Sequence, residues 1–260
     1  MWFAGVDVGS ISAEVVIVDE TGREAGAAVE FTGADSVAAS ERTLLIALRE
    51  AGITKDDLSR VVSTGYGRER VPFAQDRVTE ITCHARGAVS LFPEARTVVD
   101  IGGQDSKVIR VDQEGRVQNF QMNDKCAAGT GRFLEVMARA LEVELVEMGP
   151  LGLASTEKVS VSSVCTVFAE SEVVGLIHQG LDRKDIIRGI HAAVADRTRA
   201  LMGRVGVEPE VVMTGGVAKN QGVVQELSDR LGQKLHIPEE PQTVGALGAA
   251  LIARDRELKK

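Results

Sequence analysis

Val6-Asp7-Val8-Gly9-Ser10 decides the fold, because a closely similar stretch occurs a second time in the chain. At an offset of 93 residues the sequence reads Val99-Asp100-Ile101-Gly102-Gly103. Between the ungapped segments 6–23 and 99–116, 8 of 18 positions are identical. Each copy alternates β-branched residues with glycine turns, which predicts strand, turn, strand, turn, strand. The sequence therefore predicts two halves of similar construction.

Helical patterns follow each repeat. Pro93 interrupts the pattern near residues 92–96, where we place the boundary between the halves. The predicted helices are 36–51, 79–92, 131–141, 167–179, 182–205, 221–231 and 245–256, and short strands are predicted at 61–64 and 210–214. Strands followed by helices, twice, indicate an α/β protein with two mixed sheets. We expect a first domain at 1–94, completed by a returning C-terminal helix at 245–260, and a second domain at 95–244.

Composition excludes several classes of protein. The 260 residues are 44% hydrophobic and carry 30 basic against 38 acidic side chains, a net charge of −8. This balance argues against intrinsic disorder and against a nucleic-acid partner, which would favour a basic surface. No apolar run approaches the roughly 18 residues of a membrane span, and no signal peptide is apparent, so we expect no membrane partner and a cytoplasmic location.

Asp7 and Asp100 each end a predicted buried strand directly before a glycine turn. The repeat could be purely structural, two hairpins of similar geometry. A buried carboxylate is costly without a partner, however, which favours a functional pair. Two such loops facing one another would offer backbone N–H groups to phosphate oxygens and two carboxylates to Mg²⁺.

Two of the three cysteines, Cys126 and Cys165, lie shortly before predicted helices. A helix N-terminus favours the thiolate, the form that binds metal. Cys83 lies inside a predicted helix and is interpreted as a packing residue, with His84 beside it as a hydrogen-bonded helix residue. An iron–sulfur cluster or a Zn²⁺ ion usually takes four thiolates, so two cysteines from each subunit of a twofold dimer would suffice. The spacing alone does not distinguish the two.

Three segments together resemble the phosphate-1, phosphate-2 and adenosine motifs of the actin, Hsp70 and sugar-kinase superfamily. They are Asp7-Val8-Gly9-Ser10, Asp100-Ile101-Gly102-Gly103-Gln104-Asp105 and Met213-Thr214-Gly215-Gly216-Val217-Ala218. The resemblance implies two ribonuclease-H-like (actin-like ATPase) domains with nucleotide between them. It implies a catalytic group of Asp7, Asp100, Gln104 and Asp105. It also implies ATP contacts at Gly9, Ser10, Ile11, Ser12, Ala13, Glu14, Gly102, Gly103, Glu135, Gly215, Gly216 and Gln242.

Some of these roles have structural alternatives. Gln104 could orient the attacking water or only hold its loop. Glu135 could contact ribose or lie on a solvated helix face. Gln242, before the last predicted helix, likewise could contact the nucleotide or not.

The segments around both cysteines, together with 63–68 and 99–109, are similar to the ATP-dependent activators of 2-hydroxyacyl-CoA dehydratases and their benzoyl-CoA reductase relatives. This resemblance covers residues 5–253. It implies a homodimer with one [4Fe–4S] cluster bound by Cys126 and Cys165 of both subunits. It further implies that ferredoxin or flavodoxin supplies an electron, and that ATP-driven domain motion delivers it to the dehydratase.

One position departs from the family pattern. The family commonly has Thr or Ser after Ser10 and Lys four positions beyond it, where this chain has Ile11 and Glu14. In the internal repeat, Glu14 aligns with Lys107. Its carboxylate either points inward, weakening the attraction for phosphate, or faces outward and pairs with a base.

Two other functions remain open from the sequence. A small-molecule kinase of the same fold would need insertions for which 260 residues leave little room, and it would leave the cysteine pair unexplained. A nucleotide-dependent scaffold would be colourless, whereas a protein with an iron–sulfur cluster would be brown.

Overall fold

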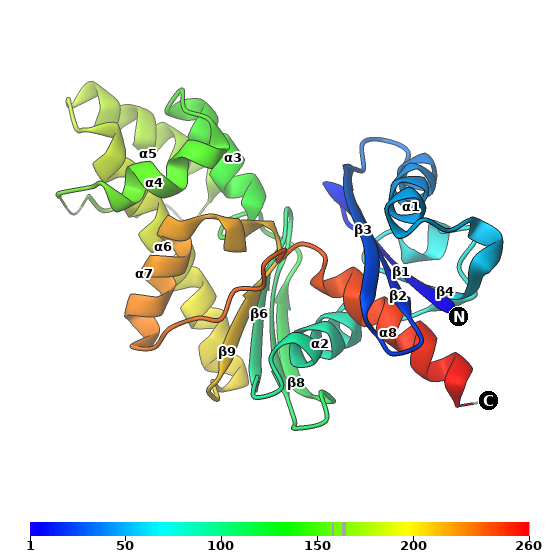
Figure 1. The fold of residues 1–260 in the computed structure, drawn as a ribbon. Coiled ribbons are helices and arrows are strands. Elements are labelled where there is room, and N and C mark those ends of the chain that lie inside the picture. Colours follow the sequence, from blue (N-terminus) through cyan, green and yellow to red (C-terminus); the bar gives the residue numbers. More distant parts are fainter. Residues whose placement is uncertain (158, 163–164, 260) are drawn as a thin grey trace.

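Two mixed β-sheets, each with helices on both faces, make up the molecule (Figure 1). The computed structural model describes residues 1–157, 159–162 and 165–259, so Lys260, the last residue of the expected returning helix, lies outside the described residues. The first sheet has the strand order β3-β2-β1-β4-β5 and the second the order β8-β7-β6-β9. The strands are β1 (Trp2–Val8), β2 (Ser12–Asp19), β3 (Glu24–Phe31), β4 (Leu58–Thr64), β5 (Asp76–Arg77), β6 (Thr97–Ile101), β7 (Ser106–Val111), β8 (Val117–Asn123) and β9 (Val211–Thr214).

The repeat in the sequence is also a repeat in strand pairing. Val6 of β1 lies opposite Val15 of β2, and Val99 of β6 lies opposite Val108 of β7, both in antiparallel pairs. Each central strand has a parallel neighbour on its other side, β4 in the first sheet and β9 in the second. The predicted α/β class with two duplicated mixed sheets is confirmed.

The helices fall close to their predicted positions. They are α1 (Ser36–Ala51), α2 (Glu80–Leu91), α3 (Gly131–Ala140), α4 (Met148–Leu153), α5 (Thr166–His178), α6 (Arg183–Val205), α7 (Gln221–Leu231) and α8 (Val244–Leu258). Asp35 starts α1 by accepting hydrogen bonds from the Val37 and Ala38 backbone, and Gly52, at φ 68°, ends it in the left-handed conformation. The short elements β5 and α4 were not predicted.

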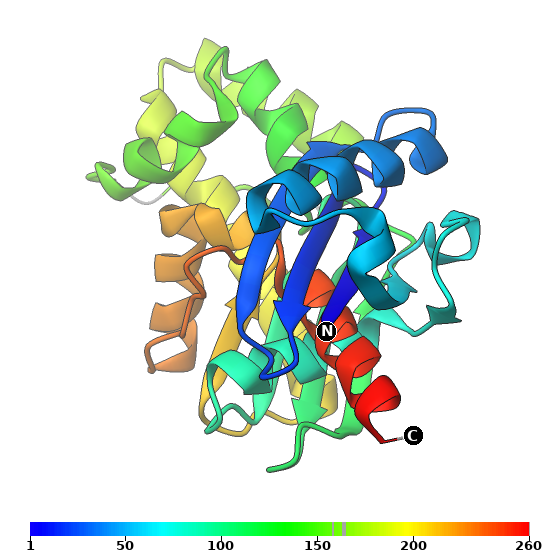
Figure 2. The ribbon, with the colours of Figure 1, turned by 45° about the vertical axis from the view of Figure 1, so that its right-hand side comes forward.

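Alternating side chains place α1 and α8 on opposite faces of the first sheet. Phe3 packs with α8 residues, whereas Ala4 and Val6 pack with residues of α1. Figure 2 shows α1 in front of the blue strands and α8 beyond them. The C-terminal helix therefore returns to complete the core of the N-terminal sheet.

α2 and α8 pack together between the two sheets (Figure 1). α2 covers the face of the second sheet that carries Val98 and Val212. The contact with α8 is close, because a Cβ at Gly248 would overlap the carbonyl oxygen of Cys83 on α2. Cys83 is fully buried there, as expected of a packing residue. In the part of the chain that the structure describes, none of the helices combines the length and the hydrophobicity of a membrane span.

Candidate functional site

A cavity of about 580 Å³ lies between loops of both sheets. Almost every residue that was predicted to form a nucleotide site lines it. The predicted residues that line it are Asp7, Gly9, Ser10, Ile11, Ser12, Glu14, Asp100, Gly102, Gly103, Gln104, Asp105, Glu135, Gly215, Gly216 and Gln242. Ala13 does not line it. Side chains alternate along β2, so Ala13 points away from Ser12 and Glu14 and is fully buried.

The two phosphate-type loops have the same backbone geometry. The N–H of Gly9 donates to the Ser12 carbonyl at 2.9 Å, and the N–H of Gly102 donates to the Asp105 carbonyl at 3.0 Å. The N-terminus of α3 fixes the second loop, because Gly131 donates to the Gly102 carbonyl at 2.9 Å. These turns hold backbone at the cavity wall, as phosphate binding requires.

Asp100 is held as an anion by the groups around it. Lys107 Nζ lies 3.0 Å from Asp100 Oδ2, and the Thr214 hydroxyl donates to Oδ1 at 3.0 Å. Burial alone would raise the pKa of this carboxyl, but His84 and Lys107, with the hydrogen bonds from Lys107 and Thr214, lower it to about 2. Asp100 is therefore ionised at neutral pH.

Asp7, the equivalent residue of the first sheet, has the opposite environment. The pKa of its carboxyl is raised to about 6. Burial raises this pKa most, His84 lowers it, and Glu80 raises it. Across the strand pair Asp7 lies opposite Glu14, where Asp100 lies opposite Lys107. The duplicated carboxylates thus differ widely in acidity.

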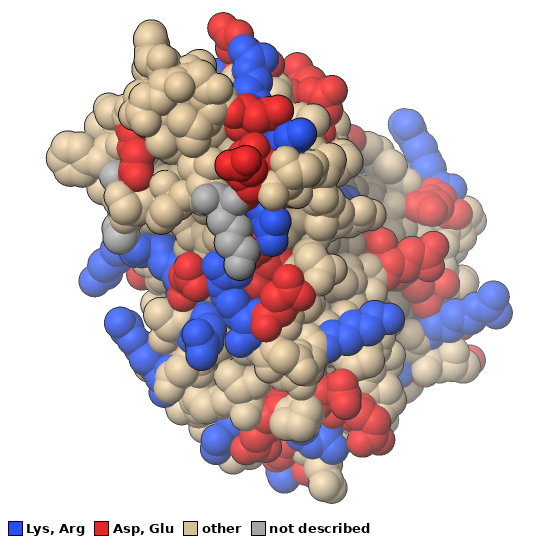
Figure 3. Space-filling model, turned by 90° about the vertical axis from the view of Figure 1, so that its left-hand side faces the viewer, with Lys and Arg blue, Asp and Glu red and all other residues tan. Residues whose placement is uncertain are grey.

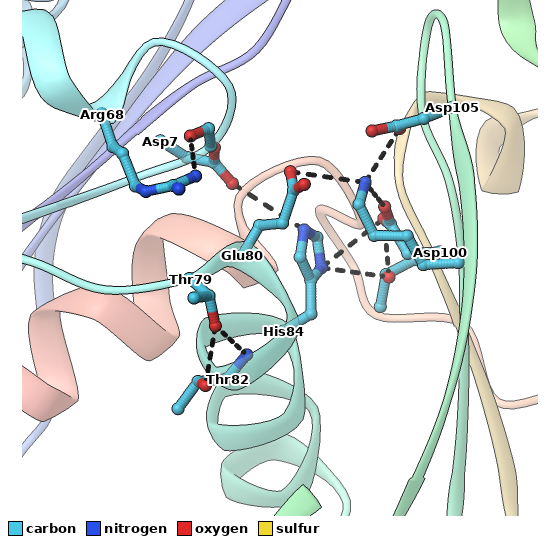
Figure 4. A network of polar contacts seen from close by, with 11 residues as sticks. Asp7, Arg68, Thr79, Glu80, Thr82, His84, Asp100 and Asp105 are labelled. Atoms are coloured by element: carbon cyan, nitrogen blue, oxygen red, sulfur yellow. Dashed lines mark hydrogen bonds and ion pairs between the residues drawn. The ribbon is translucent and has the colours of Figure 1, made fainter. Parts of the chain in front are cut away.

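His84 connects the two carboxylates, a role that its sequence context did not reveal. Its Nε2 lies 3.8 Å from Asp7 Oδ2, and its Nδ1 lies 3.5 Å from Asp100 Oδ1. Figure 4 shows the imidazole reaching from α2 between these groups, with Glu80 one helical turn away. The spacing of Glu80 and His84, four residues apart on one helix face, was the available signal.

Lys107 was used in the sequence analysis only as a repeat partner, but the structure buries it in the site. Its Nζ lies 2.8 Å from Asp105 Oδ1 and 3.5 Å from Glu80 Oε2, in addition to its contact with Asp100. These carboxylates raise its pKa in spite of burial, so it is a permanent cation.

Glu14 takes the inward of its two predicted alternatives. It lines the cavity, is only 6% exposed, and faces Asp7. Burial raises the pKa of its carboxyl well above the usual value, and the neighbouring Asp7 raises it further.

The rim of the cavity combines several of the predicted contacts. Glu135 of α3 accepts a hydrogen bond from Arg132 at 2.9 Å, so it is paired within its helix. A Cβ at Gly216 would lie 3.6 Å from the Gln242 amide nitrogen, so the backbone of the adenosine-type loop passes close to that side chain. Tyr66, which the sequence analysis did not assign, also lines the cavity and is 88% exposed.

Cys126 and Cys165 are accessible, unlike Cys83. Cys165 is exposed and occupies the N-cap position of α5. Cys126 is half-buried, and its Sγ lies 3.7 Å from Arg197 Nη2 on α6. Within the described ranges, no cluster of three or more His, Cys, Asp or Glu side chains could bind a metal ion. Thiolates are soft ligands, but these two are the only predicted ligands that this chain offers to such a centre.

The α5 end of the molecule also exposes apolar side chains. Val167 is 66% and Phe168 69% exposed, directly after Cys165. Figure 3 faces the side of the molecule that lies at the left of Figure 1, and its upper left part is largely uncharged. An apolar surface next to an exposed thiol is typical of an interaction site.

The duplicated sheets, the paired glycine loops and the cavity between them define an actin-like ATPase. The chain belongs to the BadF/BadG/BcrA/BcrD ATPase family, whose model matches residues 4–253.

Relatives match along the full chain. This protein is 48% identical to the activator of lactoyl-CoA dehydratase from Anaerotignum propionicum over 260 residues, which are 100% of both sequences. The crystal structure of (R)-2-hydroxyglutaryl-CoA dehydratase component A from Acidaminococcus fermentans superimposes with a TM-score of 0.96 at 44% identity, covering 99% of each chain. The activator of the 2-hydroxyisocaproyl-CoA dehydratase from Clostridium difficile, with bound ADPNP, gives a TM-score of 0.95 at 43% identity, covering 100% of this chain and 96% of the other.

Proposed function

We propose that this ATPase activates a 2-hydroxyacyl-CoA dehydratase, or a related CoA-ester reductase, by delivering one low-potential electron to it. The active form is a homodimer with one intersubunit [4Fe–4S] cluster. The observation that supports this most directly is the accessible pair Cys126 and Cys165, in a chain whose full-length relatives are named dehydratase activators.

Nucleotide occupies the cavity between the sheets in this proposal. The loop N–H groups around Gly9 and Gly102 face the phosphates, Asp7 and Asp100 hold Mg²⁺ through waters, and Gln104 orients the attacking water. Asp105 supports Lys107, while Gly215, Gly216, Glu135 and Gln242 contact the nucleoside. A related structure that carries ADPNP supports an adenine nucleotide.

Cys126 and Cys165 bind the cluster, so that each subunit of the dimer supplies two thiolates. A bound [4Fe–4S] cluster supplies a site that stores one transferable electron. Cys165 occupies the N-cap position of α5, so the partial positive charge of that helix N-terminus lies next to the thiolate and stabilises added negative charge. Reduced ferredoxin or flavodoxin is the proposed donor.

Domain motion couples the two sites. The moving units are residues 1–94 with the returning helix 245–260, and residues 95–244. Loops of both units line the nucleotide cavity, so a nucleotide that contacts both favours one angle between them.

A small-molecule kinase of the same fold is not favoured. The full-length relatives are activators, and a kinase role would leave the accessible cysteine pair without a purpose.

Anaerobic purification tests the proposal, with Cys126→Ala and Cys165→Ala beside the wild type. We expect a brown dimer with about four irons and four sulfides, and loss of most iron in either variant. Cys83→Ala is the matched control and should keep its iron, because this thiol is buried in the core cluster with α8, whereas Cys126 packs against a different core cluster. A wild type that contains zinc in place of iron, or a Cys126→Ala protein that keeps its cluster, would refute the assignment.

A further inference from the structure

The nucleotide cavity contains a further pair of duplicated loops besides the two phosphate-type loops. The segment Val61-Val62-Ser63-Thr64-Gly65 recurs at an offset of 150 residues as Val211-Val212-Met213-Thr214-Gly215, with 4 of 5 positions identical. Each segment ends a strand that pairs in parallel with the central strand of its own sheet. Thr64 lies beside Asp7, and Thr214 lies beside Asp100. The two segments therefore occupy equivalent places in the two halves.

The equivalence continues into the turns that follow these strands. Gly65 and Gly215 both have a φ of 83°, and a Cβ at either glycine would overlap the carboxylate of the aspartate beside its strand. The N–H of Arg68 donates to the Gly65 carbonyl at 3.4 Å, and the N–H of Ala218 donates to the Gly215 carbonyl at 3.1 Å. The two turns thus share both backbone conformation and hydrogen bonding.

At this offset Tyr66 corresponds to Gly216 of the adenosine-type loop, and both residues line the cavity. The two halves face each other across the cavity, so equivalent loops lie on opposite sides of it. In the proposed binding mode the nucleoside lies against Gly216. Tyr66 then lies at the other end, where the nucleotide presents its terminal phosphate.

The backbone at Tyr66 is fixed, whereas its side chain is free. Gly67 donates to the Val8 carbonyl at 2.8 Å, and a Cβ at Gly67 would overlap the Val8 side chain. Arg68 Nη1 donates to the Gly65 carbonyl at 3.1 Å and so braces the same turn (Figure 4). The phenol of Tyr66 is 88% exposed, and within the ranges that the structure describes its hydroxyl has no hydrogen-bond partner. This hydroxyl is therefore available to a group bound in the cavity.

We propose that Tyr66 is a catalytic residue whose hydroxyl donates a hydrogen bond to the terminal phosphoryl group of ATP during hydrolysis. The inference rests on the proposed nucleotide site and adds a residue to it. The phenol keeps its proton throughout: the attacking water forms a P–O bond, the P–O bond to ADP breaks, and the proton of the water passes to solvent. A donor placed at the phosphoryl oxygens stabilises the charge that they carry in the transition state.

Steady-state ATP hydrolysis and equilibrium binding of a fluorescent ADP analogue, both in Mg²⁺ with cluster-loaded protein, test this. Tyr66→Phe removes only the hydroxyl and Tyr66→Leu also removes the ring, and neither disturbs packing because the side chain is exposed. We expect kcat to fall by about tenfold or more in both variants, as for the loss of one hydrogen bond to a charged transition state. The dissociation constant of the ADP analogue should change by less than about twofold, because ADP lacks the terminal phosphate.

Phe120→Leu is the matched control, because Phe120 is also an exposed aromatic residue but does not line the cavity. This variant should keep both values. An unchanged kcat in Tyr66→Phe would overturn the role of the hydroxyl. Weakening of ADP binding by more than about tenfold in both Tyr66 variants would overturn the placement of this residue at the phosphate end. Failure of the wild type to bind the ADP analogue would instead overturn the nucleotide site itself, and this inference with it.

Discussion

At the scale of single residues, the duplication has placed two identical side chains in opposite electrostatic roles. Asp100 lies against Lys107 and Thr214, and its pKa is lowered to about 2. Asp7 lies against Glu14 and Glu80, and its pKa is raised to about 6. Pairs of carboxyls driven apart in this way are typical of sites that use one group as a permanent anion and the other as a proton-sensitive one.

Replacing Asp7 by Asn should stabilise the protein while impairing ATP hydrolysis. The folded pKa lies above the ordinary 3.8, so the folded state binds more protons than the unfolded state between about pH 4 and 6. The free energy of unfolding that this carboxyl contributes therefore falls as pH rises through that window. We expect Asp7→Asn to gain on the order of 1–3 kcal/mol at pH 7 and almost nothing at pH 4. Urea unfolding in EDTA measures both values.

Asp100→Asn is the contrasting variant. Its carboxyl has a lowered folded pKa and contributes stability above pH 4 that is lost as pH falls toward 2. This variant should therefore lose on the order of 1–3 kcal/mol at pH 7. Destabilisation by both substitutions, to a similar extent, would show that the two environments are alike after all.

At the scale of elements, the contact between α2 and α8 depends on small residues. Gly248 lies where a Cβ would overlap the Cys83 carbonyl oxygen, and Gly87 faces the Val244 carbonyl oxygen in the same way. This close approach lets α2 carry His84 to the point between the two carboxylates.

Gly248→Ala should separate these helices and destabilise the protein. The added methyl group meets backbone rather than a flexible side chain, so we expect a loss of about 1–3 kcal/mol and a fall in Tm of several degrees. Gly203→Ala is the matched control: Gly203 is also helical, in α6, and a Cβ there would meet nothing within 4 Å. That substitution should be neutral or stabilising by about 0.5–1 kcal/mol. Equal melting temperatures for the two variants would contradict the close packing.

The elements also show what the sequence could and could not predict. The repeat predicted both sheets, because strand pairing is encoded locally by β-branched runs and glycine turns. Capping residues set the bounds of α1 in the same local way. His84 and Glu80 were missed because their role depends on where α2 packs, which no local pattern records. The direction of Glu14 was left open for a similar reason: period-two alternation gives two faces, and only the packed sheet decides which one meets the cavity.

At the scale of the whole molecule, a chain of contacts links the nucleotide cavity to the cysteines. The second phosphate-type loop accepts hydrogen bonds from the first residues of α3, Gly131 and Arg132, at 2.9 and 2.7 Å. Cys126 precedes that helix by five residues. α3 also packs against α5, which begins at Cys165. A change in the loop therefore has a direct physical route to both thiols.

The alkylation rates of the cysteines test whether nucleotide binding changes the surroundings of Cys126 and Cys165. Cys165 is exposed and Cys126 half-buried, whereas Cys83 is buried and its pKa is raised to about 12. We expect two of the three thiols to be alkylated rapidly at pH 8 and Cys83 only after unfolding, because the thiolate is the reactive form.

Adding Mg²⁺ and a non-hydrolysable ATP analogue should then change the alkylation rates of Cys126 and Cys165 by about threefold or more, since binding must favour one arrangement of the loops over another. Cys83 is the internal reference, and mass spectrometry of each cysteine-containing peptide gives the separate rates. If the analogue binds and both rates stay constant, the contacts from the loop through α3 are only structural, and the proposed coupling of ATP to the cysteines by this route is refuted.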